Sequence, residues 1–384
     1  MKKVHLAINA GSATLKFRAY GADGHGLLVK GLVEHFGQDG GRLTLTDGKG
    51  LPLLQQELAG NGRDLAVAAV INALADRQMT VAAVVHRVVH GGHRFSEPVR
   101  LTPQVRAGLE EFVALAPLHQ PVSLAVIDAF TALDERLLQI ACFDTAFHTS
   151  QPEVATRFGI ARHWHAEGVR RYGFHGLSYA AIARRLPELG LAEAKVVVCH
   201  LGSGASACAM VQGRSVASSM GFSAVDGLLM GTRPGALDPE VLLYWMEHEG
   251  MGVAEVRREL YKNSGLLGVS GLSADMRELL ASHVPAAREA VELFCYRVVR
   301  EIGALAAAMK GLDAVIFTAG IGERSPEIRA RVVKQLAWLG FELDLSANLA
   351  QARRLTTSAS PRSAWMIPTD EEGEMLRSAA LLLG

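Results

Sequence analysis

VHLAINAGSATLKFRAY, residues 4–20, and VVVCHLGSGASACAMV, residues 196–211, are two similar stretches on which the interpretation of the whole chain depends. Each runs from an apolar, β-branched segment through a polar residue and a glycine turn into a second segment. This pattern predicts a strand, a tight turn and a strand. Aligning Asn9 with His200, an offset of 200 − 9 = 191 residues, superimposes the two glycine turns. Glycine allows close backbone approach and consecutive N–H groups can bind an anion, so two such hairpins predict a duplicated fold that closes on a nucleotide phosphate chain from both sides.

Length and composition restrict the kind of protein. The chain has 384 residues, 49% apolar and 20% charged, which predicts a well-cored globular protein of two domains. Lysine plus arginine equals aspartate plus glutamate, at 39 each, so the charge balance favours neither nucleic acid nor an anionic membrane as a partner. The apolar runs are too short for a signal peptide or a membrane span, so we expect a soluble, cytoplasmic protein. The cysteines are predicted to be buried, reduced thiols, since they lack metal-ligand spacing: Cys142, Cys199, Cys208 and Cys295.

The order of the predicted elements indicates an α/β architecture with a mixed sheet. In the first half, strands come first and then alternate with helices, and the second half repeats this order from residue 195. No proline- or serine-rich linker separates the halves, and a hinge is expected near residues 148–152. The predicted helices span residues 66–75, 102–116, 121–133, 238–250, 285–310 and 325–339, and the strands beyond the hairpins span 26–33, 81–86, 138–143, 215–219, 313–318 and 364–368.

A first candidate site lies in HRVVHGGHRF, residues 86–95, where polar residues follow an apolar run. Arg87, at the end of a predicted strand, is placed to hold a carboxylate or a phosphate by two-point contact. The neighbouring histidines are interpreted as turn hydrogen-bonding residues, because the sequence shows no zinc-ligand pattern: His86, His90 and His93.

Five further motifs carry polar residues in loops or at the ends of elements. Asp144 in FDTAFH follows a strand, where open α/β sheets bind ligands, although a helix or turn cap is an alternative. Arg233 in MGTRPGALDP lies in a loop stiffened by glycine and proline, which favours a fixed charge over a solvated one. Glu371 in TDEEGEM, after the helix cap Asp370, is either a Mg²⁺ ligand or a residue that interacts with the helix dipole. Two histidines also lie in constrained loops: His119 between prolines in PLHQP, and His175 between glycines in RRYGFHGLSY.

The stretch DAVIFTAGIGERS, residues 313–325, is predicted to run from a strand through a glycine-rich turn to a helix start. Such a junction presents backbone N–H groups to an anion or a nucleotide, although an ordinary strand–helix corner explains it equally well. The chain contains neither the dinucleotide pattern G-x-G-x-x-G nor the P-loop pattern G-x-x-x-x-G-K-[ST].

Together these residues meet the requirements of phosphoryl transfer. That reaction needs turns that hold phosphates, oxygen ligands for Mg²⁺ and cations on the transferring group, and little covalent chemistry from the protein. The residues therefore predict a phosphotransferase that uses ATP and Mg²⁺. The turns are residues 9–16 and 200–204, the cations are Arg87, His175 and Arg233, and the oxygen ligands are Asn9, Asp144 and Glu371.

The motifs also occur together, in this order, in a known family. The chain carries INAGSATLKF, HRVVHGG, LAPLH, FDTAFH, RRYGFHG, HLGSGAS, SMGF, MGTR, GVSGLSADMR, FTAGIGE and IPTDEE over nearly its whole length, and in this it resembles the acetate and propionate kinases. The resemblance implies a homodimer and an α/β fold of two duplicated ribonuclease-H-like (actin-like ATPase) domains with an interdomain cleft. The N-terminal domain would comprise residues 1–149 plus 370–384, and the nucleotide-binding C-terminal domain residues 150–369.

The resemblance implies roles for individual residues. The catalytic residues would be Asp144, His175 and Arg233, with His119 assisting, and the Mg²⁺ ligands would be Asn9 and Glu371. The carboxylate of the substrate would bind Arg87, and its alkyl group would contact Val89, Leu118, Phe174 and Ala224. The residues expected to contact ATP or ADP are Ser12, Lys16, His200, Leu201, Gly202, Ser203, Gly204, Asp275, Met276, Arg277, Gly320, Ile321, Gly322, Glu323 and Arg324.

The implied reaction is reversible transfer of the ATP γ-phosphoryl group to a short carboxylate, which gives an acyl phosphate and ADP. Ala224, commonly proline in the family, leaves room for another methylene, so propionate is an alternative acceptor to acetate. The chain also departs from the family pattern at Tyr179, where the family has histidine, and at Ser203, where it has asparagine. The alternatives from other classes are a nucleotide-gated binding protein and a sugar or polyphosphate phosphotransferase of the same superfamily.

Overall fold

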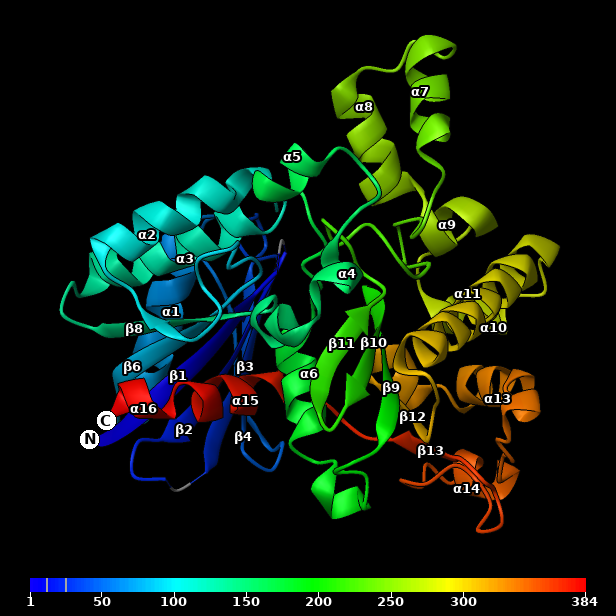
Figure 1. Cartoon of the computed structure of the whole chain (residues 1–384). Helices are drawn as coiled ribbons and strands as arrows, with labels where there is room; N and C mark the ends of the chain where they lie inside the picture. Colours follow the sequence, from blue (N-terminus) through cyan, green and yellow to red (C-terminus); the bar gives the residue numbers. More distant parts are fainter. Residues whose placement is uncertain (12, 25) are drawn as a thin grey trace. The chain divides into compact units, whose positions relative to one another are not determined.

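The computed structural model describes residues 1–11, 13–24 and 26–384, and the chain divides into two compact units (Figure 1). Unit 1 comprises Met1–Ala146 and Asp370–Gly384, and unit 2 comprises Phe147–Thr369. Each unit is built on one mixed β-sheet with helices packed against it. Both chain ends therefore belong to unit 1.

The sheet of unit 1 has the strand order β5-β4-β3-β2-β1-β6-β8-β7. The first five strands form an antiparallel meander, whereas β6 and β8 run parallel to β1 and β7 pairs antiparallel with β8. The hairpin predicted from residues 4–20 is confirmed, with Asn9 opposite Lys16 at its closed end. The strands are β1 (Lys2–Ala10), β2 (Thr14–Gly21), β3 (Leu27–Glu34), β4 (Arg42–Asp47), β5 (Pro52–Glu57), β6 (Met79–Val88), β7 (Val99–Arg100) and β8 (Leu138–Phe143).

The sheet of unit 2 repeats the central part of the first. Its order is β11-β10-β9-β12-β13, with an antiparallel meander of the first three strands and with β12 parallel to both β9 and β13. The same directions describe β3-β2-β1-β6-β8 in unit 1. The duplication predicted from the two hairpins is therefore present in the strand topology. The strands are β9 (Lys195–Leu201), β10 (Ala205–Val211), β11 (Arg214–Ser218), β12 (Ala314–Thr318) and β13 (Ser363–Met366).

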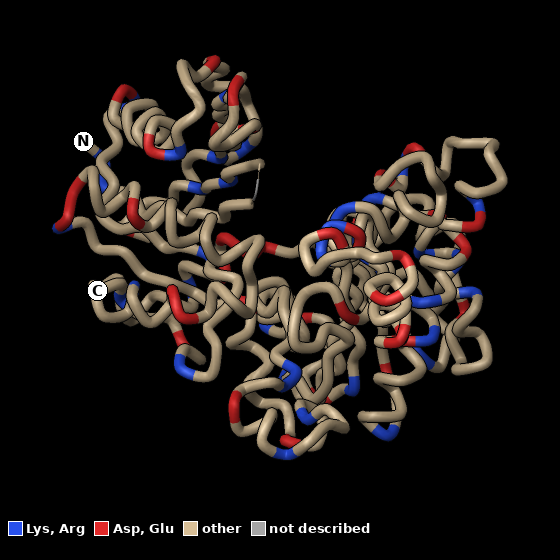
Figure 2. Tube along the Cα trace, turned by 90° about the horizontal axis from the view of Figure 1, so that it is seen from above, with Lys and Arg blue, Asp and Glu red and all other residues tan. Residues whose placement is uncertain are grey.

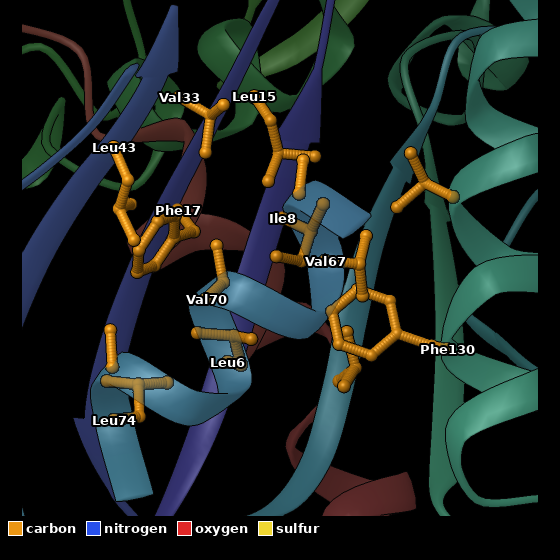
Figure 3. Packing of buried hydrophobic residues seen from close by; sticks show 14 of the residues in the cluster. Leu6, Ile8, Leu15, Phe17, Val33, Leu43, Val67, Val70, Leu74 and Phe130 are labelled. Carbon is orange, nitrogen blue, oxygen red and sulfur yellow. The ribbon is translucent and has the colours of Figure 1, made fainter. Parts of the chain in front are cut away.

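The core of unit 1 lies between its sheet and the helices α1 (Arg63–Ala75) and α3 (Gln120–Leu133) (Figure 3). Side chains alternate between the two faces of a strand, so every second residue of β1 and β2 points into this layer. Phe17 requires a glycine on the neighbouring strand, because a Cβ at Gly31 would lie 2.0 Å from the Phe17 ring. Burying each of these large side chains contributes about 1.5–3 kcal/mol. Figure 3 labels Leu6, Ile8, Leu15, Phe17, Val33, Leu43, Val67, Val70, Leu74 and Phe130.

Unit 2 buries its sheet under a long helix and a shorter one. The helix α11 (Pro285–Met309) contacts β9, β10 and β11, and Gly311 follows it, as the sequence predicts. The helix α6 (Gly176–Ala183) packs Tyr179 and Ile182 against Val196 and Val198 of β9. The strands β9 and β10 are buried almost throughout, which explains their continuous apolar sequence.

The remaining helices lie in the connections between strands or after the last strand (Figure 1). Near its C-terminus the chain returns to the first sheet through α15, which contacts β1 and β6. The helices are α2 (Pro103–Glu110), α4 (Glu153–Thr156), α5 (Arg162–Ala166), α7 (Pro239–Glu247), α8 (Val253–Arg258), α9 (Gly265–Ser270), α10 (Met276–Ala281), α12 (Ala319–Arg324), α13 (Pro326–Gln335), α14 (Leu345–Leu349), α15 (Glu371–Ser378) and α16 (Ala380–Leu383).

Several predicted elements need correction. The glycine-rich turn expected after β12 is the short helix α12, and the helix expected over residues 238–250 ends at Glu247. The helix expected over residues 102–116 changes to a 3₁₀ turn after Glu110. His86, interpreted as a turn residue, instead lies buried in β6, where its Nε2 hydrogen bonds to the Gln139 side chain at 2.8 Å. His90 does bond within its turn, accepting the Gly92 N–H at 2.9 Å.

Basic and acidic residues are both scattered over the chain (Figure 2). Over the described ranges, no helix is long and apolar enough to cross a membrane. The four predicted thiols, at positions 142, 199, 208 and 295, are buried and free of disulfides, which confirms that expectation.

Candidate functional site

Arg87 and Asp144 meet in unit 1 because β6 and β8 run parallel and side by side. The register pairs Val88 with Phe143, so Asp144 follows β8 directly beside the end of β6. The Asp144 backbone N–H donates to the Val88 carbonyl at 3.1 Å. Nε of Arg87 donates to Oδ1 of Asp144 at 3.1 Å, and Nη2 donates to Oδ2. The two-point contact predicted for Arg87 is thus made within the protein, on a carboxylate that is 1% exposed.

Asn9 and Glu371 extend this pair into a network of four polar side chains. Nη1 of Arg87 donates to Oδ1 of Asn9 at 3.0 Å, and Nδ2 of Asn9 donates to Oε2 of Glu371 at 3.2 Å. Glu371 is the first residue of α15, and Asp370 caps that helix by accepting the Gly373 N–H, as the sequence predicts. The network therefore joins the first strand, the ends of two parallel strands and α15.

The charges in this network compensate one another. Burial alone would lower the pKa of Arg87, but the negative charges of Asp144 and of two glutamates raise that pKa above its usual range. Burial raises the pKa of Glu371, while Arg87 and the hydrogen bond from Asn9 act in the opposite direction. Removing Arg87 would leave Asp144 buried without its cation, a change that typically costs about 3–5 kcal/mol.

Four other predicted residues of unit 1 lie near these elements. Lys16 is exposed on β2 opposite Asn9, and its charge partly opposes the rise that burial causes in the pKa of Glu371. His119 is the N-cap of α3, and Val89 is buried directly after β6, whereas Leu118 is half-buried. A structural role for Gln120 was not predicted from the sequence. Its buried side chain donates to the carbonyls of His90 and Leu109 and accepts the His90 N–H. Gln120 thereby ties the loop of His119 to the loop that follows Arg87.

In unit 2, His148 anchors the loop that carries His175. Nε2 of His148 bonds to the Phe174 carbonyl at 2.9 Å and therefore carries the proton, while Nδ1 accepts from Ser215 Oγ at 2.9 Å. Burial lowers the pKa of His148 to about 4, so the ring is neutral at pH 7. Gly173 packs on this ring with φ of +73°, and a Cβ there would lie 2.6 Å from it. His148 belongs to the quoted motif FDTAFH, but no sequence signal linked it to residue 175.

His175, His200, Gly204 and Arg233 meet at the closed end of the β9–β10 hairpin. A Cβ added to Gly204 would lie 2.7 Å from Nη2 of Arg233 and 3.4 Å from Nε2 of His175. The rings of His175 and His200 stack with centroids 4.1 Å apart and planes 13° from parallel. Only glycine lets the backbone of this turn lie against both a guanidinium and an imidazole. The structure thus brings together three predicted phosphate-contacting elements.

The loop of Arg233 is held by α9. Leu266 donates its N–H to the Met230 carbonyl at 2.8 Å, and Leu267 donates to Gly231 at 3.0 Å. Nη1 of Arg233 donates to the Ala224 carbonyl at 2.6 Å. Burial lowers the pKa of Arg233, but a guanidinium remains a cation near neutral pH.

Two groups of residues predicted to contact the nucleotide lie at helices of unit 2: residues 275–277 at the start of α10 and residues 320–324 within α12. Asp275 caps α10 by accepting the Arg277 N–H at 2.8 Å, and the Arg277 side chain lowers the pKa of Asp275 to about 2. Glu323 does not point to solvent, because its Oε1 accepts the N–H groups of Ala319 and Thr369 at 2.9 and 3.1 Å. Gly320 and Arg324 are exposed on α12, and Ile321 is half-buried.

The other predicted nucleotide residues differ in exposure. Leu201, Met276 and Gly322 are buried. The Ser203 carbonyl accepts the Gly231 N–H at 3.0 Å, and Gly202 lies close to the start of α12. Ser12 lies outside the described residues, and the roles predicted for this group stay predictions.

Known proteins resemble the whole chain. Residues 4–377 match the model of a family described as the acetokinase family. An acetate kinase from Rhodopseudomonas palustris is 49% identical, with 97% of this chain and 96% of the relative covered. A crystal structure of Porphyromonas gingivalis acetate kinase aligns with a TM-score of 0.89 at 34% identity, with 100% of each chain covered. A propionate kinase from Francisella tularensis aligns with a TM-score of 0.92 at 32% identity, with 98% of each chain covered.

Gly265→Ala is predicted to damage the Arg233 loop. The φ of Gly265 is +69°, and a Cβ there would lie 2.3 Å from the Met230 carbonyl oxygen and 2.7 Å from the Arg233 N atom. Gly271→Ala is the matched control, because its φ is +61° with no atom within 4 Å of the added Cβ. We expect the control to lose about 1–2 kcal/mol of unfolding free energy from the left-handed conformation alone, and Gly265→Ala to lose clearly more. Equal losses in urea unfolding would show that the close contact is absent.

Proposed function

The chain belongs to the acetokinase family, and on that premise we propose that it is an acetate kinase. Its reaction is the reversible transfer of the γ-phosphoryl group of Mg·ATP to acetate, which gives acetyl phosphate and ADP. The two sheets have the duplicated ribonuclease-H-like, actin-like ATPase fold of the acetate and propionate kinases that they match. The predicted interdomain cleft stays a prediction.

The observation that carries the proposal is the packing of Gly204 on Arg233 and His175. A transferring phosphoryl group carries negative charge on three oxygens, and it is stabilised by fixed donors that need no reorganisation. The turn of the β9–β10 hairpin brings its backbone close to the site. Arg233 contributes a cation that is held in place by the Ala224 carbonyl, and His175 contributes an imidazole beside it. These three groups suit stabilisation of a phosphoryl group during its transfer better than binding of a nucleotide alone.

The acceptor is proposed to bind through residues of unit 1. Arg87 is a guanidinium kept in place by Asp144 and Asn9, and a guanidinium recognises a carboxylate by its paired N–H groups. We propose that Asp144 positions Arg87 for the acceptor. Alkyl contacts are assigned to Val89 and Leu118 of this unit, and the roles of Phe174 and Ala224, which belong to unit 2, stay predictions.

Mg²⁺ is proposed to bind Asn9 and Glu371. Amide and carboxylate oxygens are the ligands that Mg²⁺ prefers, and this ion commonly uses one or two protein oxygens together with phosphates and water. Nδ2 of Asn9 lies 3.2 Å from Oε2 of Glu371, so the two side chains are close together, while Oδ1 of Asn9 accepts from Nη1 of Arg87. When bound, the ion would neutralise phosphate charge.

The proposed phosphoryl transfer requires little proton transfer by the protein. A carboxylate is ionised at neutral pH, so the acceptor needs no strong general base. Catalysis is proposed to come from positioning and from charge stabilisation by Arg233 and His175, with His119 assisting. The nucleotide is proposed to lie against Ser12, Lys16 and residues 200–204, 275–277 and 320–324.

A substrate panel tests this function. Purified chain with Mg·ATP is given acetate, propionate, butyrate or glycerol, and the readouts are acyl phosphate trapped as hydroxamate and ADP release. We expect acetate to give the highest kcat/KM and EDTA to abolish turnover. A methylene is worth about 10–200-fold in such a pocket, so a higher value for propionate would make that the acceptor, as Ala224 and the similar Francisella protein suggest. A rate of ADP release that does not depend on added carboxylate would refute the acyl kinase activity. Phosphorylation of glycerol would favour another phosphotransferase.

Arg233→Ala is predicted to lower kcat by about 100-fold or more, as loss of one fixed transition-state donor does elsewhere. Arg331→Ala is the control, since Arg331 lies on α13 in an exposed ion pair with Glu327 at 2.6 Å. The control should keep near wild-type turnover. Comparable kcat values for both variants, with unchanged melting temperatures, would remove Arg233 from the reaction.

We also propose a cytoplasmic homodimer. ATP as substrate and buried, reduced thiols suit the cytoplasm. No residue of α7, all of which are described, is buried, and its Leu243, Tyr244 and Met246 side chains are 47%, 51% and 40% exposed. Apolar side chains gathered in this way are typical of a surface that another chain covers. Sedimentation velocity should give twice the monomer mass of 41.1 kDa, and a monomer at micromolar concentration would contradict the proposal.

A further inference from the structure

Beside His175 lies a chain of buried hydroxyl groups that the proposed roles do not use. Nδ1 of His175 lies 2.8 Å from Ser206 Oγ, and Ser206 Oγ lies 2.5 Å from the hydroxyl of Tyr179. Ser206 and Tyr179 are both fully buried. We propose that Tyr179 and Ser206 are positioning residues that place the proton of neutral His175 on Nε2, so that the ring donates a hydrogen bond to the transferring phosphoryl group. This inference rests on the proposed function.

The geometry of α6 brings these groups together. His175 is the N-cap of the helix, with φ of +56°, and the Tyr179 N–H donates to the His175 carbonyl at 3.0 Å. Residues four apart lie on one face of a helix, so Tyr179 stands directly behind His175. Ser206 comes from β10, opposite His200 in the hairpin. The side chain of Tyr179 is held by an edge contact with the His148 ring, whose centroid is 5.6 Å away.

The count of hydrogens decides the direction of the two bonds. Each hydroxyl has one hydrogen, and a buried hydrogen without an acceptor is costly. In the described part of the chain, Ser206 Oγ is the acceptor recorded within reach of the Tyr179 hydroxyl. If Tyr179 donates to Ser206, the Ser206 hydrogen is left for Nδ1 of His175, and both hydroxyl hydrogens are used.

The reverse arrangements each leave a hydrogen unused. If Ser206 donates to Tyr179, the phenol hydrogen has no acceptor recorded among the described residues. If Tyr179 and His175 both donate to Ser206, the Ser206 hydrogen is left over instead. A phenol is also the more acidic hydroxyl and hence the better donor. Nδ1 is therefore an acceptor, and the neutral ring carries its proton on Nε2.

The Nε2 atom is on the side of the ring where this proton can act. Nε2 of His175 faces Gly204, at 3.4 Å from the position of a Cβ there, and Nη2 of Arg233 faces the same position. A ring with the proton on Nδ1 would instead present a lone pair to a phosphoryl oxygen, which is repulsive. We call the hydrogen-bonded chain of Tyr179, Ser206 and His175 the relay. By placing the proton on Nε2, the relay makes the interaction of His175 with a developing anion attractive instead of repulsive.

Tyr179→Phe tests the relay, with Tyr296→Phe as the control because Tyr296 is 53% exposed on α11. We expect Tyr179→Phe to lower kcat about 10-fold while the KM values for acetate and ATP stay within about twofold, as is typical for a group that acts only in the transition state. Ser206→Ala should lower kcat at least as much, and Ser206→Thr, which keeps the hydroxyl, should restore most of it. The double variant Tyr179→Phe with Ser206→Ala should be no slower than Ser206→Ala alone, because the two residues act in series.

A spectroscopic readout separates the relay from the proposed function. Nitrogen-15 NMR of histidine-labelled full-length protein, with the His175 signal identified from a His175→Asn sample, reports which ring nitrogen carries the proton. The relay predicts the Nε2–H form in the wild type and a mixture of forms in Tyr179→Phe. An Nδ1–H ring in the wild type, or additive losses in the double variant, would overturn the relay. A wild type that shows the Nε2–H form but phosphorylates no carboxylate would refute the proposed function and leave the tautomer assignment standing.

Discussion

The lack of a side chain at Gly204 is the constraint on which the candidate site of unit 2 depends. The turn between β9 and β10 lies against Nη2 of Arg233 and Nε2 of His175. A Cβ at Gly204 would lie 2.7 and 3.4 Å from those atoms, so only glycine fits at this position. The same contact keeps a guanidinium and an imidazole next to the backbone of the turn. Such donors stabilise an anion without reorganising when its charge shifts. The chemistry proposed for unit 2 follows from this close packing.

In unit 1, hydrogen bonds and opposite charges hold charged side chains in fixed positions away from water. Asp144 is 1% exposed, and burial of such a carboxylate is tolerated because Arg87 neutralises it at two points. Asn9 then connects Arg87 to Glu371, a residue 362 positions away in the sequence from Asn9. A network of this kind contributes little to stability compared with an apolar core, but it fixes the direction of each group. Direction is what an acceptor carboxylate and a metal ion require.

Local signals predicted much of the fold. The two hairpins, the parallel strands after them and the caps at Thr102 and Asp370 follow from residue periodicity and from short polar side chains at helix starts. The strands β4 and β5 were missed, since nothing in the local pattern marked them as continuations of the meander. The helix α12 was mistaken for a turn because its two glycines lower helix propensity. There Glu323 and the fully buried Arg329 hydrogen bond to the backbone of the segment and hold it helical.

The sequence by itself determined which residue types stand at the ends of strands and in the stiff loops, and hence that the chain suits phosphoryl transfer. Only the tertiary structure decided that Arg87 holds Asp144, that His148 anchors the loop of His175, and that Tyr179 and Ser206 lie behind its ring. The physical reason is that periodicity and capping act over a few residues, whereas these contacts join residues 26 to 57 positions apart and depend on the direction of each side chain. Strand register and core packing set both, and neither can be read from a local pattern.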